Sequence, residues 1–590
     1  MRERELLIVS RAKADRIGRF VVGSLLLLPA LLTFGFACWF PALRTLGLSL
    51  QAAALGRPAR FAGLSNYAYL WRDPAVGPAL ARSLLVAALR ALAVSTLPVL
   101  VGRLWSRQGP GLRLLARGAL SLGLALSAPA GLALLWCLAV PRTPWLRWLA
   151  TGDGSRDLLA YLGLEFVSFL GVGGALTALT LLHCRPWSGR LGRGVIALAA
   201  LAAFASGLDT FSLPFVMARL GQQQVVTLSL QVFRTAFQRL QLGLAAAEAS
   251  PLLLLSLGLG LAFALLEERF ELRLAPAGAE YRSGRSWAAA LAGVAALALL
   301  LLPVVLLYLW GAGQAFLFPG RPLARAASVL QVELALVNGN LAPILAILLL
   351  QLPAAYLAAL SLTLVRPFGQ LGSRLAFAGL VASGFVPSAV VAVGLFDVVQ
   401  RVGLSNTLMA SGLPLVANPA SLVIFRLYFA GQAPRIEQAR RTGRPALAAF
   451  FQQVFRPSLG VAALAGAASF LLAGQSLLWP LLTLARSDLY PLSLRLVVHQ
   501  AQLAGAPAAL AAGAWLVLTC WGLATLLVWW LLQALVLERL RLEVEVSPRS
   551  PSATESTLPA APGSSPGRRS PATGGRSPGR RRGCRSASHP

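Results

Sequence analysis

Long apolar runs alternate with short polar segments along most of the chain. Each run is long enough to cross the hydrocarbon core of a bilayer as an α-helix, which takes about 20 residues. The first six runs lie near residues 20–40, 84–104, 118–140, 159–182, 194–216 and 246–266. The second six lie near residues 288–309, 339–365, 374–397, 411–430, 457–484 and 508–535. The pattern predicts an all-α integral membrane protein with about 12 transmembrane helices, six in each half.

The composition favours the same class. Of the 590 residues, 57% are apolar and 12% are charged. A soluble globular chain carries about 25% charged residues. The number of membrane spans is therefore a better guide to the architecture than a count of soluble domains.

Arginines indicate the orientation of the spans. A basic segment, residues 1–19, precedes the first run and is too charged for a signal peptide, so we expect a retained span and a cytoplasmic N-terminus. The connections that should then be cytoplasmic contain Arg107, Arg113, Arg117, Arg185, Arg190, Arg193, Arg269, Arg273, Arg282, Arg285, Arg366, Arg374, Arg435, Arg440, Arg441, Arg444 and Arg456. The opposite connections contain Arg57, Arg60, Arg72, Arg142, Arg147, Arg156, Arg321 and Arg325, so the bias is moderate.

The net charge of +31 is carried almost entirely by arginine, and the chain has a single lysine, Lys13. A Walker A loop needs a lysine after its glycines, and no such turn precedes Lys13. The three histidines cannot form a zinc-binding HExxH helix, and the five cysteines show no paired spacing. We therefore expect no ATP hydrolysis or other enzyme activity in this chain, no metal site and no cofactor.

Few acidic residues lie within or beside the apolar runs, among them Glu165, Asp209 and Asp397, and such residues are expensive in a bilayer. We expect Glu165 and Asp397 to lie near a membrane interface. For Asp209 the sequence leaves open whether it lies at an interface or at the centre of the membrane. Proton-coupled carriers usually need acidic groups at the centre of the membrane. The three residues therefore favour such a carrier only weakly.

The last segment, residues 547–590, is rich in Ser, Pro, Gly and Arg and has no apolar period. This composition predicts a disordered tail. Its eight arginines could contact anionic lipid, but nucleic-acid binding is not expected as the main function.

A polar segment with helical character separates the tenth and eleventh runs. Apolar or small residues recur at steps of three or four along residues 430–460, namely Ile436, Ala439, Gly443, Leu447 and Phe450. Pro434 is expected near a helix start. A short helix of this kind fits the groove of a partner protein.

This segment resembles the coupling loop of permease subunits in binding-protein-dependent ABC importers, which reads EAA, three residues, Gly, nine residues, an apolar residue and LP. Gln438 replaces the first Ala of that pattern, and Pro457 follows one residue late. The resemblance implies that an ATPase partner docks on Arg435, Glu437, Gln438, Ala439, Arg440, Gly443 and Pro457.

Further stretches resemble the two unlike permease subunits of maltose-type sugar importers. FAGLSNYAYLWRD at 61–73 and TLSLQVFRTAFQRLQLG at 227–243 are similar to the first subunit. AAYLAAL at 354–360, Pro387, GLSNTL at 403–408, LLWPLLTL at 477–484 and LYPLSLRL at 489–496 are similar to the second. The resemblance implies two fused subunits: residues 1–19 as a cytoplasmic segment, 20–287 as the first permease half, 288–546 as the second half with its EAA-like loop at 434–457, and 547–590 as the tail.

The chain departs from the family at two places. Gly474, Gln475 and Ser476 replace the family's Trp-Asn-Asp, which puts contacts of those side chains in doubt. In the first half, the connection at 183–193 is too short for a coupling loop and contains no glutamate. The first half is therefore expected to have lost that loop, so that one ATPase would meet only a short turn bearing Arg185, Arg190 and Arg193.

The resemblance implies a transmembrane permease subunit of an ATP-driven importer in the cell (inner) membrane of a bacterium or archaeon, with both termini cytoplasmic. Its expected partners are two ABC ATPase subunits, an extracytoplasmic solute-binding protein and membrane lipid, and its expected solute is a sugar or related carbohydrate. Possible sugar contacts include Trp136, Phe211, Ser383, Gln475 and Trp479, none of which is assigned. A degenerate or regulatory permease-like protein and a twelve-span secondary carrier remain alternatives.

Overall fold

The computed structural model describes residues 2–54, 57–106, 108–144, 146–150, 154–184, 189–220, 225–276, 287–441, 448, 450–474 and 476–544. The first half contains α1 (Arg2–Phe34), η1 (Gly35–Trp39), α2 (Phe40–Ser49), β1 (Gln51–Ala52), β2 (Arg60–Phe61), α3 (Ser65–Leu70), α4 (Val76–Ser95), α5 (Leu97–Ser106), α6 (Pro110–Ala125), α7 (Pro129–Ala139), η2 (Val140–Arg142), η3 (Arg147–Ala150), α8 (Gly154–Phe169), η4 (Leu170–Gly174), α9 (Ala175–Leu182), α10 (Gly189–Leu208), α11 (Ser212–Arg219), α12 (Leu228–Phe233), η5 (Arg234–Gln238), α13 (Leu242–Phe270) and β3 (Leu272–Pro276).

The second half is equally helical. It contains α14 (Trp287–Phe316), α15 (Pro322–Leu330), α16 (Val332–Ala346), η6 (Ile347–Gln351), α17 (Leu352–Leu360), η7 (Ser361–Val365), α18 (Gly369–Ser383), α19 (Ser388–Arg401), α20 (Leu408–Gly412), η8 (Leu413–Val416), α21 (Pro419–Arg441), η9 (Phe451–Phe455), α23 (Arg456–Gly474), α24 (Leu478–Thr483), η10 (Ser487–Leu489), α25 (Leu492–Val498), α26 (Gln500–Ala504), α27 (Pro507–Leu535), η11 (Leu537–Arg539) and β4 (Leu540–Val544).

Twelve helical segments of the described chain could cross a membrane. Nine are single segments that are long and apolar enough, and three more are bent pairs of helices. All twelve coincide with the apolar runs of the sequence, which confirms an all-α, multi-span membrane protein.

Proline explains the two sharpest bends. The third span bends by 79° between α6 and α7, and the ninth bends by 81° between α18 and α19. Pro129 is the first residue of α7, and Pro387 directly precedes α19 in an extended conformation, with φ −63° and ψ 147°. Because proline has no N–H and disfavours a helical residue before it, these two prolines favour the end of the preceding helix. The two halves therefore break at equivalent spans.

The halves interlock through reciprocal helix pairs. The first span of each half packs on the second span of the other half, since α1 contacts α17 and α14 contacts α5. Likewise, α13 contacts α18 and α27 contacts α6. The described residues accordingly form one compact unit, and its largest apolar cluster combines side chains of both halves, such as Leu132 and Leu518.

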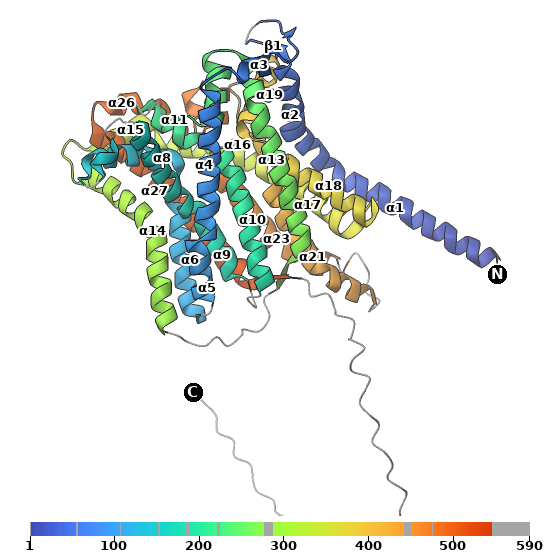
Figure 1. The fold of residues 1–590 in the computed structure, drawn as a ribbon. Coiled ribbons are helices and arrows are strands. Elements are labelled where there is room, and N and C mark those ends of the chain that lie inside the picture. Colours follow the sequence, from blue (N-terminus) through green and yellow to red (C-terminus); the bar gives the residue numbers. More distant parts are fainter. Residues whose placement is uncertain are drawn as a thin grey trace, which may run out of the picture. The chain divides into compact units, whose positions relative to one another are not determined.

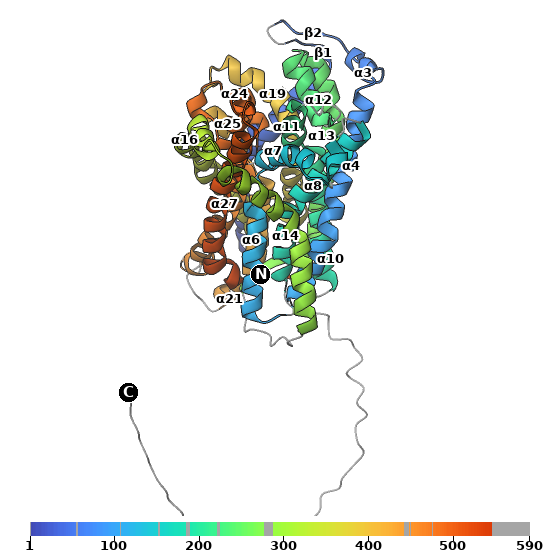
Figure 2. The same ribbon diagram turned by 90° about the vertical axis from the view of Figure 1, so that its left-hand side faces the viewer.

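Two small β-ladders lie at opposite ends of the bundle. β1 and β2 form a hairpin beside α3, and we call this the hairpin end (Figure 1). At the other end, which we call the ladder end, β3 pairs antiparallel with β4, from Leu272–Val544 to Pro276–Leu540. The N–H of Leu542 also donates to the carbonyl of His183, at 3.1 Å. The ladder therefore ties together the chain segments that follow α9, α13 and α27, and α10, α14 and α21 end or begin on this side as well (Figure 2).

One local expectation needs correction. Pro434 does not begin a helix, because α21 continues through it to Arg441. The basic segment 1–19 is helical and continues into the first span within α1. The predicted tail at 547–590 lies outside the described residues.

Candidate coupling surface and buried ion pairs

The predicted coupling residues lie at the ladder end, where α21 leaves the bundle and the chain returns into α23. The side chains of Arg435 and Gln438 are exposed, whereas Ala439 is only 4% exposed. Pro457 is exposed and is the second residue of α23. The side chains of Glu437 and Arg440, and all of Gly443, lie outside the described residues.

Aromatic side chains extend this surface. Phe451 is 50% exposed and Phe455 is 38% exposed, and their rings meet edge to face with centroids 5.5 Å apart. The Tyr428 hydroxyl donates to the carbonyl of Val454 at 2.7 Å, which fixes η9 against α21. Arg435, Gln438, Phe451 and Phe455 together form what we call the α21–η9 surface. Exposed aromatic and arginine side chains are typical of protein–protein contacts.

The ladder packs closely against α21. A Cβ atom at Gly431 would lie 1.9 Å from the carbonyl oxygen of Leu274 in β3, so only glycine permits this approach. Nearby, Arg426 of α21 forms ion pairs with Glu267 at 2.8 Å and Glu268 at 3.2 Å, both near the end of α13. These contacts fasten the second-half helix α21 to the end of the first half.

In the first half, the equivalent connection is short. α9 ends at Leu182 and α10 begins at Gly189, so too few residues separate them for a pair of coupling helices. Arg190 donates to the carbonyl of Arg269 at 3.1 Å, and Arg193 is exposed. Arg185 lies outside the described residues.

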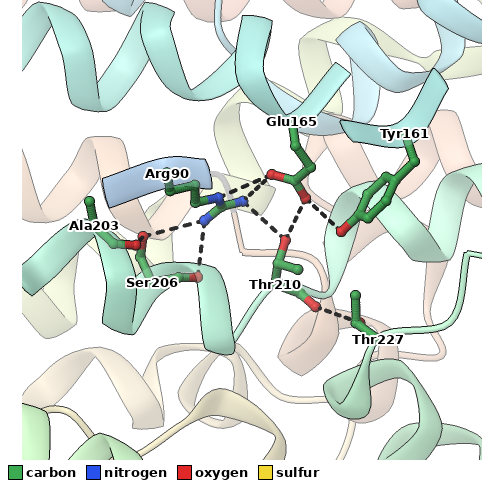
Figure 3. A network of polar contacts seen from close by, with 7 residues as sticks. All are labelled: Arg90, Tyr161, Glu165, Ala203, Ser206, Thr210 and Thr227. Atoms are coloured by element: carbon green, nitrogen blue, oxygen red, sulfur yellow. Dashed lines mark hydrogen bonds and ion pairs between the residues drawn. The ribbon is translucent and has the colours of Figure 1, made fainter. Parts of the chain in front are cut away.

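A buried polar network lies inside the first half (Figure 3). Glu165 is fully buried and forms an ion pair with Arg90 at 2.7 Å. Its other oxygen accepts hydrogen bonds from Tyr161 at 2.8 Å and from Thr210 at 2.9 Å. Arg90 also donates to the carbonyl of Ser206 at 3.0 Å. Complete pairing of this kind offsets the cost of burying two charges.

This network gives Glu165 a setting that the sequence did not show. Its carboxylate is enclosed within the first half by α4, α8 and the α10–α11 connection. Sequence reasoning overlooked its partner, although an arginine in the middle of the second apolar run was itself a signal, since an intramembrane charge usually has a partner.

Asp209 joins the two halves. Its carboxylate accepts hydrogen bonds from the backbone N–H of Ser388 at 2.8 Å and from the Ser388 hydroxyl at 2.9 Å. Ser388 is the first residue of α19, so the carboxylate also faces the positive end of that helix dipole. Asp209 therefore links the short α10–α11 connection of the fifth span to the break in the ninth.

Asp397 lies near the end of α19. Its carboxylate contacts Arg44 of α2 at 2.5 Å and Arg401 at 2.9 Å. The pair with Arg44 is a second polar link between the halves, at the hairpin end.

The possible sugar contacts do not converge. Phe211 stacks with Phe215, with centroids 5.0 Å apart, in the central apolar cluster, and Trp136 packs against that cluster. Trp479 belongs to a different cluster and donates to the carbonyl of Ala410 at 2.7 Å. Ser383 donates to the carbonyl of Leu380, and Gln475 lies outside the described residues. These contacts are those of packing residues.

Among the described residues, no group of three or more His, Cys, Asp or Glu side chains is placed to hold a metal ion. A scan against protein-family models found no matching family, and a search of curated proteins found no significant match.

Proposed function

We propose that the chain is the permease subunit of an ATP-driven importer of the ABC type, moving a solute of the sugar class supplied by an extracytoplasmic binding protein. The ladder end would face the cytoplasm of a bacterium or archaeon, and two ATPase subunits would dock there. The observation that carries the proposal is the α21–η9 surface, a basic and aromatic projection directly continuous with a membrane-spanning helix. Its sequence is also the part that resembles the coupling loop of such permeases.

The geometry of α21 suits force transmission. The helix runs without interruption through 23 residues, which corresponds to about 34 Å at 1.5 Å per residue. An ATPase that moves the α21–η9 surface would therefore move the whole tenth span with it as a rigid body.

The ladder gives a route by which one coupling surface moves both halves. β3 continues from α13 of the first half and lies against Gly431, and Arg426 pairs with Glu267 in the same region. Displacement of α21 would therefore pull on α13 as well. This arrangement compensates for the short connection between α9 and α10, and it supports asymmetric transport rather than a degenerate permease.

A twelve-span secondary carrier is the second candidate. The observation that favours it is Asp209, an acidic group at the contact between the halves, where a carrier would place a coupling-ion site. Against it, Glu165 is already neutralised by Arg90 inside one half.

Co-purification tests the proposal. The tagged protein is extracted from its native membrane in mild detergent, and the chains that accompany it are identified. We expect an ATPase with a Walker A loop, lost in the double variant Arg435→Glu/Phe451→Asp and retained in Arg60→Gln at the hairpin end. Absence of any ATPase with the unaltered chain, or its retention with the double variant, would contradict the proposal.

A further inference from the structure

A cavity of about 1030 Å³ opens between the two halves at the hairpin end. α2 and the chain after it form one wall, with Arg44, Gln51 and Arg57. The end of α19 forms the other, with Asp397, Gln400 and Arg401. Its volume is slightly above the range of typical small-molecule sites, about 300–1,000 Å³.

The lining of this cavity is strongly basic. Arg44, Arg57 and Arg401 give three positive charges against the one negative charge of Asp397, which leaves a formal charge of +2. The single carboxylate contacts both Arg44 and Arg401, but it cannot satisfy all their donors. The Nε atom of Arg44 is buried and has no hydrogen-bond partner among the described residues.

The surroundings of the cavity do not neutralise this charge. The adjacent hairpin and the turn after α3 present exposed Arg60 and Arg72, against the one acidic residue Asp73. These are arginines that the positive-inside rule leaves unexplained, because they lie on the side proposed to face outward. A concave site lined by one sign of charge raises the local concentration of oppositely charged ligands.

We propose that this cavity binds the carboxylate or phosphate group of the transported solute, so that the solute is an acidic sugar or a sugar phosphate rather than a neutral sugar. Planar guanidinium groups pair with two oxygens of such anions at once. The cavity lies between two halves that are proposed to move against each other, as an entry site requires. The inference rests on the importer function proposed above.

A substitution of Asp397 should change the affinity for an anion in a direction that distinguishes this proposal from a structural role. Its carboxylate contacts the same guanidinium groups, those of Arg44 and Arg401, that an incoming anion would use. Asp397→Asn should therefore raise the affinity for an anion by about tenfold, the effect of one unit charge removed at close range in a partly solvated site. A merely structural role for Asp397 predicts no gain.

The test measures binding of inorganic phosphate, glucuronate and glucose to the purified full-length protein by isothermal titration calorimetry. We expect phosphate and glucuronate to bind and glucose not to bind, with affinity falling as salt is added. Arg44→Gln and Arg401→Gln should each weaken the binding of both anions by about tenfold. Arg321→Gln is the matched control, since Arg321 is exposed and does not line the cavity, and it should leave binding unchanged.

Several outcomes would overturn the proposal. One is equal binding of glucose and glucuronate, and another is weaker anion binding by Asp397→Asn in a protein whose melting temperature is unchanged. A third is Arg44-dependent binding of hexaglutamate with which phosphate and glucuronate do not compete. That result would show that the cavity binds an acidic protein surface and not a small anion. Co-purification of the ATPase is scored separately, so failure of anion binding leaves the importer proposal standing, and the reverse also holds.

Discussion

Replacing Gly431 by alanine probes the contact through which α21 is proposed to move the first half. The added Cβ would lie 1.9 Å from the carbonyl oxygen of Leu274 and 2.8 Å from its carbonyl carbon. Both atoms belong to the backbone of a paired strand, so no side chain can rotate away. Relief requires α21 and β3 to separate by more than 1 Å, and overpacking of this kind costs about 1–3 kcal/mol.

We expect Gly431→Ala to lower the melting temperature and to lower the stimulation of the partner ATPase by solute several-fold, while the ATPase still co-purifies. The assay compares ATP hydrolysis with and without solute-loaded binding protein in nanodiscs. Gly379→Ala in α18 is the matched control, because no atom lies within 4 Å of the added Cβ. It should be neutral or stabilising by up to about 1 kcal/mol. Unchanged stability and stimulation in Gly431→Ala would refute the proposed route through the ladder.

Three further predictions concern charged groups. Glu165→Gln should destabilise the protein by about 3–5 kcal/mol, because it leaves Arg90 buried without its counter-charge; a milder loss in Glu165→Gln/Arg90→Gln, measured by thermal unfolding, checks this cause. Asp209→Ala should weaken the link to Ser388 and change the protease accessibility of the halves, whereas Asp209→Asn, which keeps an acceptor, should do so less. Burial and neighbouring arginines lower the pKa of His183 to about 4. The stability that the neutral imidazole contributes above pH 6.5 should therefore be lost as the pH drops toward 4. The variant His183→Asn should lack this part of the pH dependence of the melting temperature.

The sequence predicted the spans well, because a run of about 20 apolar residues has few other stable environments. It also placed Pro387 inside the ninth span, where proline breaks the helix. The interior of a span is harder to predict, since Arg90 and Glu165 lie 75 residues apart and only the packing of α4 on α8 brings them together.

The ladder end shows the other limit of sequence reasoning. β3 and β4 are five residues each and lie more than 260 residues apart in the sequence, so no local sequence pattern predicts that they pair. The helix through Pro434 was missed for a related reason. Proline removes one backbone hydrogen bond, yet the helix continues beyond it, and the buried side chain of Ala439 packs that last part of α21 against the bundle.

The sequence predicted which residues form the coupling surface, and the structure describes only some of their side chains. Arg435, Gln438 and Pro457 are exposed at the ladder end, as a docking surface requires, but Ala439 is buried and so helps to hold α21 in place. The exposed rings of Phe451 and Phe455 were not anticipated. The spacing of apolar residues in a short polar segment does not show which side of the helix packs against the bundle.

Photo-crosslinking from the α21–η9 surface tests the central claim most directly. A photoreactive amino acid replaces exposed Gln438 in one variant and exposed Arg60 at the hairpin end in another, and each is irradiated in native membranes. The importer account predicts that the product from position 438 contains an ATPase with a Walker A loop and that the product from position 60 does not. Crosslinking of an ATPase from position 60, or of none from position 438 in membranes where uptake is active, would contradict it.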